Sequence, residues 1–561
     1  MKPRHRDGAV AVWWVVFFAL VPSMCAQEAP APRHTGVPQD WSQHHIVFSR
    51  DALARHPDLI YREPRILHQA MQRWQAPNSD VFHGAAARPV SANNSGQHRD
   101  WSVNLSGRLI ANMFPAKFSF DAGAPPDCNN DYVVFGLAVA QTPGASGTGV
   151  DPGLVAFNNL YSDPVNGGGF CDPPNGPGLG PLVLFAYNIT TVTGGKIVTS
   201  PILSEDGTKI GFVESVPGAT PQAIFHVLTW TSGQGTLLAA AAPTKMTSLT
   251  FSTNADSTSS SPWIDYSNDI VYLGADNGVV YQITGVFKGT PTIGANPPWP
   301  VTVSNNLHLT SPVLDVGLGV LMVGSTNGTL YQINTTTGAL ATLEVGKSGG
   351  TSPGIVAAPI VDVSNGTTFV VSANDGTSAV LVEADTASMT QLSKARIGQG
   401  AAGGTALNLY EPAFTNSYFT NPSNGDIRLC GTGAADTTPW QYAFGFTGRT
   451  MTTTPAGKQQ LLTSTAARCT GWTEFFNPNV NGGTDFFFFG LTQDCTAPGN
   501  GPADGCVVAR SSSTTLTKAT VNGGPSGIVV DNYSTAGQAS SIYLMADKVS
   551  TAYKFTQNGL K

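Results

Sequence analysis

A sequence repeat of about 50 residues occurs along the middle of this chain. In the first copy, Ser261-Pro262-Trp263-Ile264-Asp265 is followed by Ile270–Gly274, Asp276-Asn277-Gly278 and Val279–Ile283. The second copy keeps the same order, with Ser311-Pro312-Val313-Leu314-Asp315, Val320–Gly324, Thr326-Asn327-Gly328 and Thr329–Ile333. A looser third copy begins at Ala358-Pro359-Ile360-Val361-Asp362. The chain must therefore fold into repeated units of the same kind.

Each unit contains short apolar runs rich in β-branched and aromatic residues, bounded by Gly, Asn, Asp or Pro, which predict strands. Asn277-Gly278 and Asn327-Gly328 predict tight hairpin turns, because Asn and Gly adopt positive φ at low cost. One four-stranded unit has two apolar faces and can bury them only between like neighbours. An all-β fold, a single β-propeller, is therefore predicted.

Weaker units on both sides complete the ring. Their first strands are expected near Phe114–Phe118, Ser200–Leu203, Glu411–Phe414, Trp472 and Gly527–Asp531. With the three clear copies they make eight blades, and seven blades are the alternative if one weak unit is an insertion. Asp100–Leu105 precedes the first unit, so we expect it to pair with the C-terminal blade and close the ring. Gly- and Pro-rich stretches such as Gly167–Gly180 are expected to be loops on the rim.

The N-terminus predicts export. Lys2, Arg4 and Arg6 precede an uncharged run, and Ala26 offers a small residue at a cleavage point. We therefore divide the chain into a signal peptide (1–26), an N-terminal extension (27–99) and the propeller (100–561), and expect a secreted or periplasmic protein. A lipoprotein anchored at Cys25 is the minority alternative. After signal removal, no stretch approaches the roughly 20 apolar residues that a membrane helix needs.

The cysteines agree with an oxidising compartment. Without Cys25 six remain, and proximity within units favours Cys128 with Cys171, Cys430 with Cys469, and Cys495 with Cys506. Charged residues make up only 12% of the chain and its net charge is −7, so there is no basic stripe and we expect no nucleic-acid partner. The exported protein is expected to be a monomer.

The extension is Pro- and His-containing. Pro64–Trp74 predicts a short amphipathic helix with Ile66, Ala70 and Trp74 on one face. The extension holds seven of the ten histidines: His34, His44, His45, His56, His68, His83 and His98. Their irregular spacing does not require a metal, so we expect polar surface on a segment that packs over the propeller and no metal site.

The repeats Ser261–Ile283 and Ser311–Ile333 resemble the blades of quinoprotein-like β-propellers. This superfamily includes pyrroloquinoline-quinone dehydrogenases and non-catalytic exported members. The resemblance spans about residues 258–385. A catalytic member would be expected to carry adjacent cysteines over the cofactor, and this chain has none. The resemblance therefore favours the non-catalytic members, and we expect no cofactor. Asp265, Asp315 and Asp362 recur at one blade position, which predicts turn acceptors rather than catalysts.

The loops that enter innermost strands gather at one mouth of a propeller channel. This would place His308, Glu411 and Glu474 there, and they are the candidate ligand-binding residues. No catalytic residue is assigned. The sequence favours a binding or scaffolding module for a protein or glycan partner. The alternative is a propeller enzyme, either a quinone-dependent dehydrogenase or one that cleaves polysaccharide or peptide in the channel.

Overall fold

The structure is a computed structural model. It describes Met1 and residues 36–48, 63–74, 97–120, 125–294 (without 166, 175 and 177), 297–347, 354–398, 408–431, 438–477, 483–511, 516–531 and 538–557. The predicted signal peptide lies outside this part of the chain except for Met1, as do His34, His56 and His83. All the elements below belong to one unit, residues 35–561.

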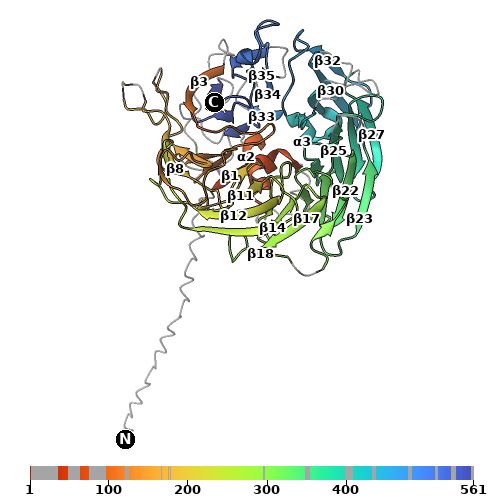
Figure 1. The fold of residues 1–561 in the computed structure, drawn as a ribbon. Coiled ribbons are helices and arrows are strands. Elements are labelled where there is room, and N and C mark those ends of the chain that lie inside the picture. The colour runs from red at the N-terminus through yellow and green to blue at the C-terminus, as the bar shows by residue number, and fades with distance from the viewer. Residues whose placement is uncertain are drawn as a thin grey trace. The chain divides into compact units, whose positions relative to one another are not determined.

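Within the described residues, eight mainly antiparallel sheets of four or five strands form the blades of a ring, as predicted (Figure 1). The strands of blades 1 to 4 follow one another in the sequence, and each blade is given from its innermost strand outward. Blade 1 has β4 (Ala116–Ser119), β5 (Tyr132–Gly136), β7 (Leu154–Asn158) and β8 (Leu182–Tyr187). Blade 2 has β10 (Ile202–Leu203), β11 (Lys209–Val216), β12 (Gln222–Thr229) and β14 (Met246–Ser252), with β9 (Lys196–Ile197) beside β11. Blade 3 has β15 (Trp263–Asp265), β16 (Ile270–Gly274), β17 (Val279–Thr284), β18 (Thr292–Ile293) and β19 (Val301–Thr302). Blade 4 has β20 (Val313–Asp315), β21 (Val320–Gly324), β22 (Thr329–Asn334) and β23 (Leu340–Glu344).

Blades 5 to 7 repeat this order, and blade 8 takes its last strand from elsewhere. Blade 5 has β24 (Ile360–Asp362), β25 (Thr367–Ser372), β26 (Val380–Asp385) and β27 (Thr390–Arg396). Blade 6 has β28 (Ala413–Phe414), the short helices α3 (Asn416–Thr420) and η3 (Pro422–Asn424), β29 (Asp426–Gly431), β30 (Trp440–Thr447), β31 (Thr450–Met451) and β32 (Gly457–Gln460). Blade 7 has β33 (Thr473–Asn477), β34 (Thr484–Leu491), the turn η4 (Pro502–Asp504), β35 (Cys506–Ser511) and β36 (Leu516–Thr520). Blade 8 has β37 (Val529–Asp531), β38 (Ser541–Met545) and β39 (Thr551–Gln557).

The fourth strand of the sheet that contains β37, β38 and β39 is β3 (Gln97–Asn104), from the N-terminal side of the ring. It pairs antiparallel with β39 from Gln97 opposite Gln557 to Asn104 opposite Thr551. Trp101 of β3 packs against Phe157 of blade 1 and Tyr543 of blade 8, and its indole nitrogen donates to the Leu160 carbonyl at 3.1 Å. Trp101 of β3 therefore contacts both blade 8 and blade 1.

The first two copies of the sequence repeat form the inner hairpins of blades 3 and 4. Gly278 and Gly328, which follow the turn asparagines, have φ of +81° and +87°, in the region that glycine adopts without strain. Asp265 accepts from the backbone N–H groups of Ser267 and Asn268, at 3.0 and 3.2 Å, and Asp315 and Asp362 accept in the same way from the residues that follow them. The prediction that these aspartates are turn acceptors is confirmed.

The blades bury their apolar faces against one another. Fully buried side chains such as Trp263, Tyr132, Phe488 and Leu544 lie in clusters that extend from blade to blade. Three disulfides join Cys128 to Cys171, Cys430 to Cys469, and Cys495 to Cys506, the pairs expected from the sequence. No helix among the described residues is long and apolar enough to cross a membrane.

Candidate functional site

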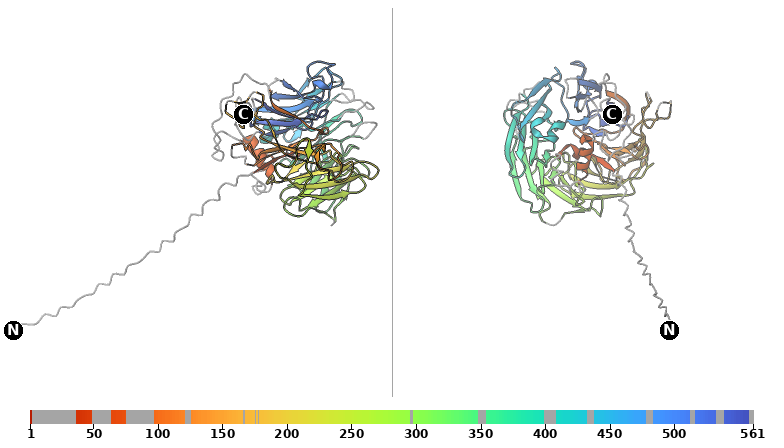
Figure 2. Two further views of the ribbon diagram at one scale, coloured as in Figure 1. Left: turned by 60° about the vertical axis from the view of Figure 1, so that its left-hand side comes forward. Right: turned by 180° about the vertical axis from the view of Figure 1, so that it is seen from behind.

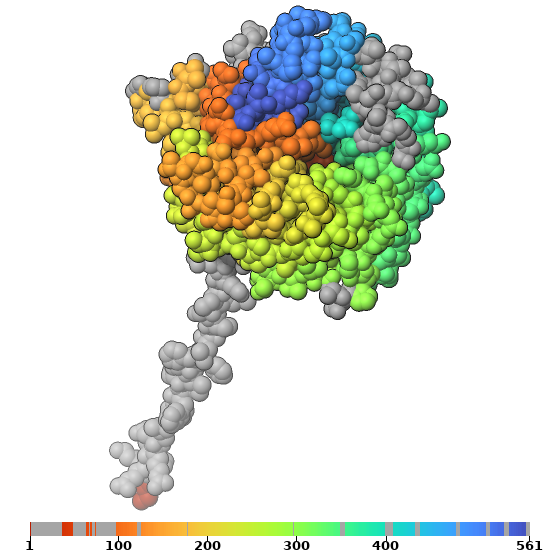
Figure 3. All heavy atoms as spheres, viewed as in Figure 1, coloured from red at the N-terminus to blue at the C-terminus, as the bar shows by residue number. Residues whose placement is uncertain are grey.

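The N-terminal extension enters the centre of the ring. Its first strand, β1 (Val37–Gln39), pairs antiparallel with β4, the innermost strand of blade 1. Its second strand, β2 (Ile46–Val47), pairs in parallel with β24, the innermost strand of blade 5. The turn η1 (Trp41–His44) lies between them, and α2 (Pro64–Trp74) lies with β1 inside the ring (Figure 1; Figure 2, right). Red atoms of this part of the chain are recessed at the centre of the face in Figure 3.

We call residues 36–48 and 63–74 the channel segment. Two large side chains attach it to blade 3. The Trp41 indole donates to the Pro262 carbonyl at 3.0 Å, and Arg65 donates to the Ile264 carbonyl at 3.0 Å. The Arg65 guanidinium also donates to both oxygens of Glu63 at 2.9 Å and lies 4.3 Å from the centre of the Trp263 ring. The channel segment thus carries a paired, fully buried charge that contacts the innermost strand of a blade.

Contacts within the channel segment join its two parts. The Gln69 amide of α2 donates to the Ile46 carbonyl at 2.6 Å and accepts from the Phe48 backbone at 3.1 Å. Ile66 of α2 is buried, as its predicted face requires, whereas the side chains of Ala70 and Trp74 lie outside the described residues. The helix therefore holds the strand-like part of the segment in place.

The expectation of a polar, histidine-bearing surface is wrong for His45 and His68, which are buried. Burial lowers the pKa of His45 to about 4 and that of neighbouring His44 to about 3, and it holds the pKa of His68 well below its usual value. These side chains are therefore neutral near pH 7, and His68 and His45 hydrogen-bond to Gln43 and to the Trp41 carbonyl. The physical reason is that the extension enters the channel rather than covering the outside of the ring.

Glu474, one of the three predicted site residues, lies on β33 and faces α2. Its Oε2 accepts from Arg73 of α2 at 2.6 Å, and burial raises the pKa of this carboxyl to about 8 although Arg73 opposes the shift. Beside the pair is a cavity of about 50 Å³, lined by the channel segment and by blades 6 to 8. Several buried polar atoms around it have no hydrogen-bond partner: Gln39 Oε1 and Nε2, Arg73 Nε and Nη1, Trp472 Nε1 and Glu474 Oε1. Such a space is suited to a few water molecules and is too small for an organic substrate.

Glu411, the second predicted residue, is buried just before β28 rather than exposed at a channel mouth. With the Asn112 amide turned so that its nitrogen faces Glu411, this nitrogen donates to both carboxylate oxygens, at 3.3 and 3.0 Å. Burial raises the pKa of Glu411 to about 7. A side chain at Gly471 would meet the Glu411 carboxylate at 1.8 Å, so the glycine there leaves room for this carboxylate.

His308, the third predicted residue, lies in the loop before β20, and half of its side chain is exposed. Its Nδ1 is 3.2 Å from Asp276 Oδ2 and 3.2 Å from the Thr258 hydroxyl, both from blade 3. In a catalytic triad, the acid and the nucleophile hydrogen-bond to opposite nitrogens of the histidine ring. Here Asp276 and Thr258 both face Nδ1 of His308, so Thr258 does not have the position of a triad nucleophile. Among the interactions of the described residues, none joins His308 to Glu411 or Glu474.

A loop of blade 1 exposes large apolar side chains to solvent. Of the described residues between β7 and the start of β8, Val165, Phe170, Leu179 and Leu182 are 70, 43, 77 and 47% exposed. We call residues 161–182 the blade 1 loop. The sequence pattern of Gly and Pro predicted a rim loop here, but it did not show which apolar side chains would point outward.

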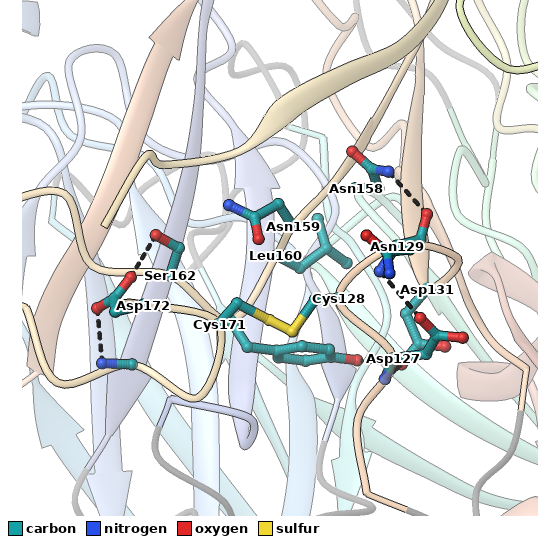
Figure 4. Close-up of a disulfide and its surroundings, with 12 residues drawn as sticks. Asp127, Cys128, Asn129, Asp131, Asn158, Asn159, Leu160, Ser162, Cys171 and Asp172 are labelled. Atoms are coloured by element: carbon teal, nitrogen blue, oxygen red, sulfur yellow. Dashed lines mark hydrogen bonds between the residues drawn. A yellow bond between two sulfur atoms is a disulfide. The ribbon is translucent and has the colours of Figure 1, made fainter. Parts of the chain in front are cut away.

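The described residues of the blade 1 loop are nevertheless held in place (Figure 4). The Cys128–Cys171 disulfide ties its middle to the loop before β5. The Asp172 carboxylate accepts from the Ser162 hydroxyl at 2.5 Å, from the Asp163 backbone at 3.1 Å and from the Gly169 backbone at 2.7 Å. Such internal bonds hold one loop conformation, so the apolar side chains are presented without a further ordering cost.

Fold and channel together define an eight-bladed β-propeller whose centre holds part of its own chain. No protein-family model matches the chain, and no curated protein matches it. Among solved structures, it is similar to the computationally designed Ika8 protein, with 13% identity, a TM-score of 0.45 and coverage of 82% of this chain and 99% of that one. Saccharomyces cerevisiae Sqt1 has 11% identity, a TM-score of 0.42 and coverage of 83% and 99%. The periplasmic gluconolactonase PpgL of Pseudomonas aeruginosa has 12% identity, a TM-score of 0.35 and coverage of 64% and 99%. Likenesses this distant carry no inference about function.

Proposed function

We propose that this protein is an exported, non-catalytic binding module that docks a protein partner through the blade 1 loop. One observation carries the proposal: four large apolar side chains of this loop face solvent on a backbone that a disulfide and the Asp172 hydrogen bonds hold in place. Large apolar side chains that face solvent on one ordered loop are typical of surfaces that bind another protein.

The charge of the loop favours a protein over other partners. Residues 161–182 include no Lys or Arg, so the loop offers nothing to attract an anionic membrane surface. Its two acidic residues are used within the structure, since Asp163 is buried and Asp172 accepts the hydrogen bonds given above. A glycan has little apolar surface to cover four such side chains. An uncharged apolar patch on a protein complements the loop best.

Three further observations support the role. The channel segment occupies the centre of the ring, where a propeller enzyme of the alternative hypothesis would bind its substrate. The three disulfides and the charged-then-apolar N-terminus support export. The blades that resemble quinoprotein-like propellers do so without the adjacent cysteines of catalytic members.

The test uses quantitative affinity capture from the native envelope or medium, with three forms of the protein as bait. The docking variant is Val165→Ser with Leu179→Ser, and the control is Leu318→Ser with Leu340→Ser, which replaces leucines of similar chemistry exposed by 46 and 44% on blade 4. A partner retained by wild type and control, but weakened about 30-fold or more in the docking variant, supports the proposal. Equal retention by all three forms contradicts it, as does quinone-dependent dye reduction by a protein that retains no partner.

The second candidate function is an enzyme, and His308 beside Asp276 is the observation that favours it. A histidine next to a carboxylate is a common general base. An activity screen on polysaccharides and peptides, with His308→Ala as the comparison, tests this function. Activity that disappears in the variant would replace the binding module by the enzyme.

A further inference from the structure

The seam between blade 8 and blade 1 brings together three side chains that can bind a metal. His98 and Asp100 come from β3, and Asp163 comes from the start of the blade 1 loop. One oxygen or nitrogen from each lies within 4.8 Å of the others. His98 and Asp163 are 65 positions apart along the chain, and the pairing of β3 with β39, next to blade 1, brings them together.

The distances between the ligand atoms lie within about 2 Å of those that a small divalent ion requires. His98 Nε2 is 2.6 Å from Asp163 Oδ2 and 3.7 Å from Asp100 Oδ1. With metal bonds of about 2.0–2.2 Å, neighbouring ligand atoms lie roughly 3–3.5 Å apart. The short His98–Asp163 contact has to open and the longer contacts have to shorten, each by less than about 2 Å, for one ion to be held.

An independent observation points to a ligand at this place. The Asp100 side chain is fully buried, and its Oδ1 has no hydrogen-bond partner. Its other oxygen is already used, since Oδ2 accepts from Lys554 Nζ and, at 2.6 Å, from the Thr556 hydroxyl. A buried carboxylate oxygen without a partner is costly, and Oδ1 lies on the side of the carboxyl that faces His98.

Neighbouring groups position these side chains. Asp163 Oδ1 accepts from the Val165 backbone at 3.0 Å, and its Oδ2 accepts from the Gln538 amide at 3.1 Å. Lys554 offsets one of the two carboxylate charges, which leaves one net negative charge for a divalent ion. The His98 side chain is 41% exposed while both carboxylates are buried, so an ion can reach the site from solvent beside the imidazole.

We propose that His98, Asp100 and Asp163 bind a divalent transition-metal ion of the kind that Zn²⁺ represents. An imidazole nitrogen beside two carboxylates suits zinc-like ions, whereas Ca²⁺ prefers an all-oxygen set. On binding, Nε2 of His98 loses to solvent the proton that it donates to Asp163 and coordinates the ion, and the neutral ring then carries its proton on Nδ1. The ion then joins β3 to the blade 1 loop, a function independent of whether that loop docks a partner.

The test is calorimetric titration of ZnCl₂ into purified, chelator-treated protein without a polyhistidine tag. The test variants are His98→Gln and Asp163→Asn, and the matched control is His308→Gln, which removes another partly exposed histidine beside an aspartate. We expect wild type and His308→Gln to bind one ion at the same affinity and the test variants to bind it about 100-fold more weakly. Parallel titrations with MnCl₂ and CaCl₂ should show weaker binding of Ca²⁺.

A thermal-unfolding readout separates ion binding from damage to the fold. Without metal, His98→Gln should unfold at the temperature of wild type, because its side chain is partly exposed. With Zn²⁺ in excess, only wild type and His308→Gln should gain a few degrees. The proposal is overturned if wild type binds no ion, or if His98→Gln binds Zn²⁺ as tightly as wild type does.

Discussion

At the residue scale, burial controls the ionisable side chains of the channel. It raises the pKa of Glu411 to about 7 and of Glu474 to about 8, and it lowers those of His44 and His45 to about 3 and 4. A carboxyl with a raised pKa binds its proton more tightly in the folded state, so its contribution to stability is lost as pH rises. A histidine with a lowered pKa binds its proton less tightly in the folded state, so the free energy of unfolding falls as the pH falls below the ordinary histidine pKa of 6.5.

These signs predict how stability depends on pH. Between pH 6.5 and about 8 the carboxyls of Glu411 and Glu474, together with Glu383, whose pKa burial raises to about 7, outweigh the buried histidines, which are half protonated in the unfolded state at pH 6.5 and neutral in both states by pH 8. The free energy of unfolding should fall across it by on the order of 1–2 kcal/mol per carboxyl. Denaturant titrations at both ends of the window measure this fall, and a stability that rises with pH would contradict it.

Glu411→Gln isolates one of these carboxyls. The amide keeps the shape of the side chain but cannot ionise, so the variant should lose its share of the fall between pH 6.5 and 8. The same denaturant titrations apply, with Glu205→Gln as a surface control whose stability should follow wild type. An unchanged pH slope in Glu411→Gln would show that this carboxyl is not buried.

At the element scale, the channel segment depends on Arg65. Arg65→Ala removes the bonds to Glu63, Ser42 and Ile264 and leaves the Glu63 carboxylate buried without its partner. The variant should lose about 3–5 kcal/mol of unfolding free energy. Arg449→Ala, which breaks a partly exposed ion pair with Asp385, should lose less than about 1 kcal/mol. Equal losses in urea titrations would mean that Arg65 does not hold the segment in the channel.

The blade 1 loop depends on its disulfide. Replacing both Cys128 and Cys171 by Ser opens a link between residues 43 positions apart, which should cost about 3–4 kcal/mol. The loop should then be cut by proteases faster than in wild type, whereas Cys495→Ser with Cys506→Ser should leave its cleavage rate unchanged. Limited proteolysis with mass spectrometry identifies the cut positions. Slow cleavage in both variants would show that the hydrogen bonds of Asp172 hold the loop without the disulfide.

At the scale of the whole molecule, local sequence patterns predicted the blades of the ring but did not predict that the channel segment lies at its centre. The turn at Asn277-Gly278 and the hydrogen bond that Asp265 accepts involve only residues a few positions apart. The roles of these residues could therefore be inferred from the sequence. The bond from Trp41 to Pro262 spans 221 positions, and that from Arg73 to Glu474 spans 401. No periodicity connects residues so far apart. The same holds for His98 and Asp163, which meet only once β3 lies beside blade 1.

Residues 36–48 occupy the channel, which leaves the outer loops for partners. Hydrogen exchange followed by mass spectrometry tests this placement most directly. Several backbone N–H groups of this stretch are bonded: Ser42 to Asp40, His45 to the Ser42 carbonyl, and Phe48 to Gln69. Peptides from this stretch should therefore exchange as slowly as the inner strands β16 and β21. Exchange as fast as that of an unstructured leader would contradict it.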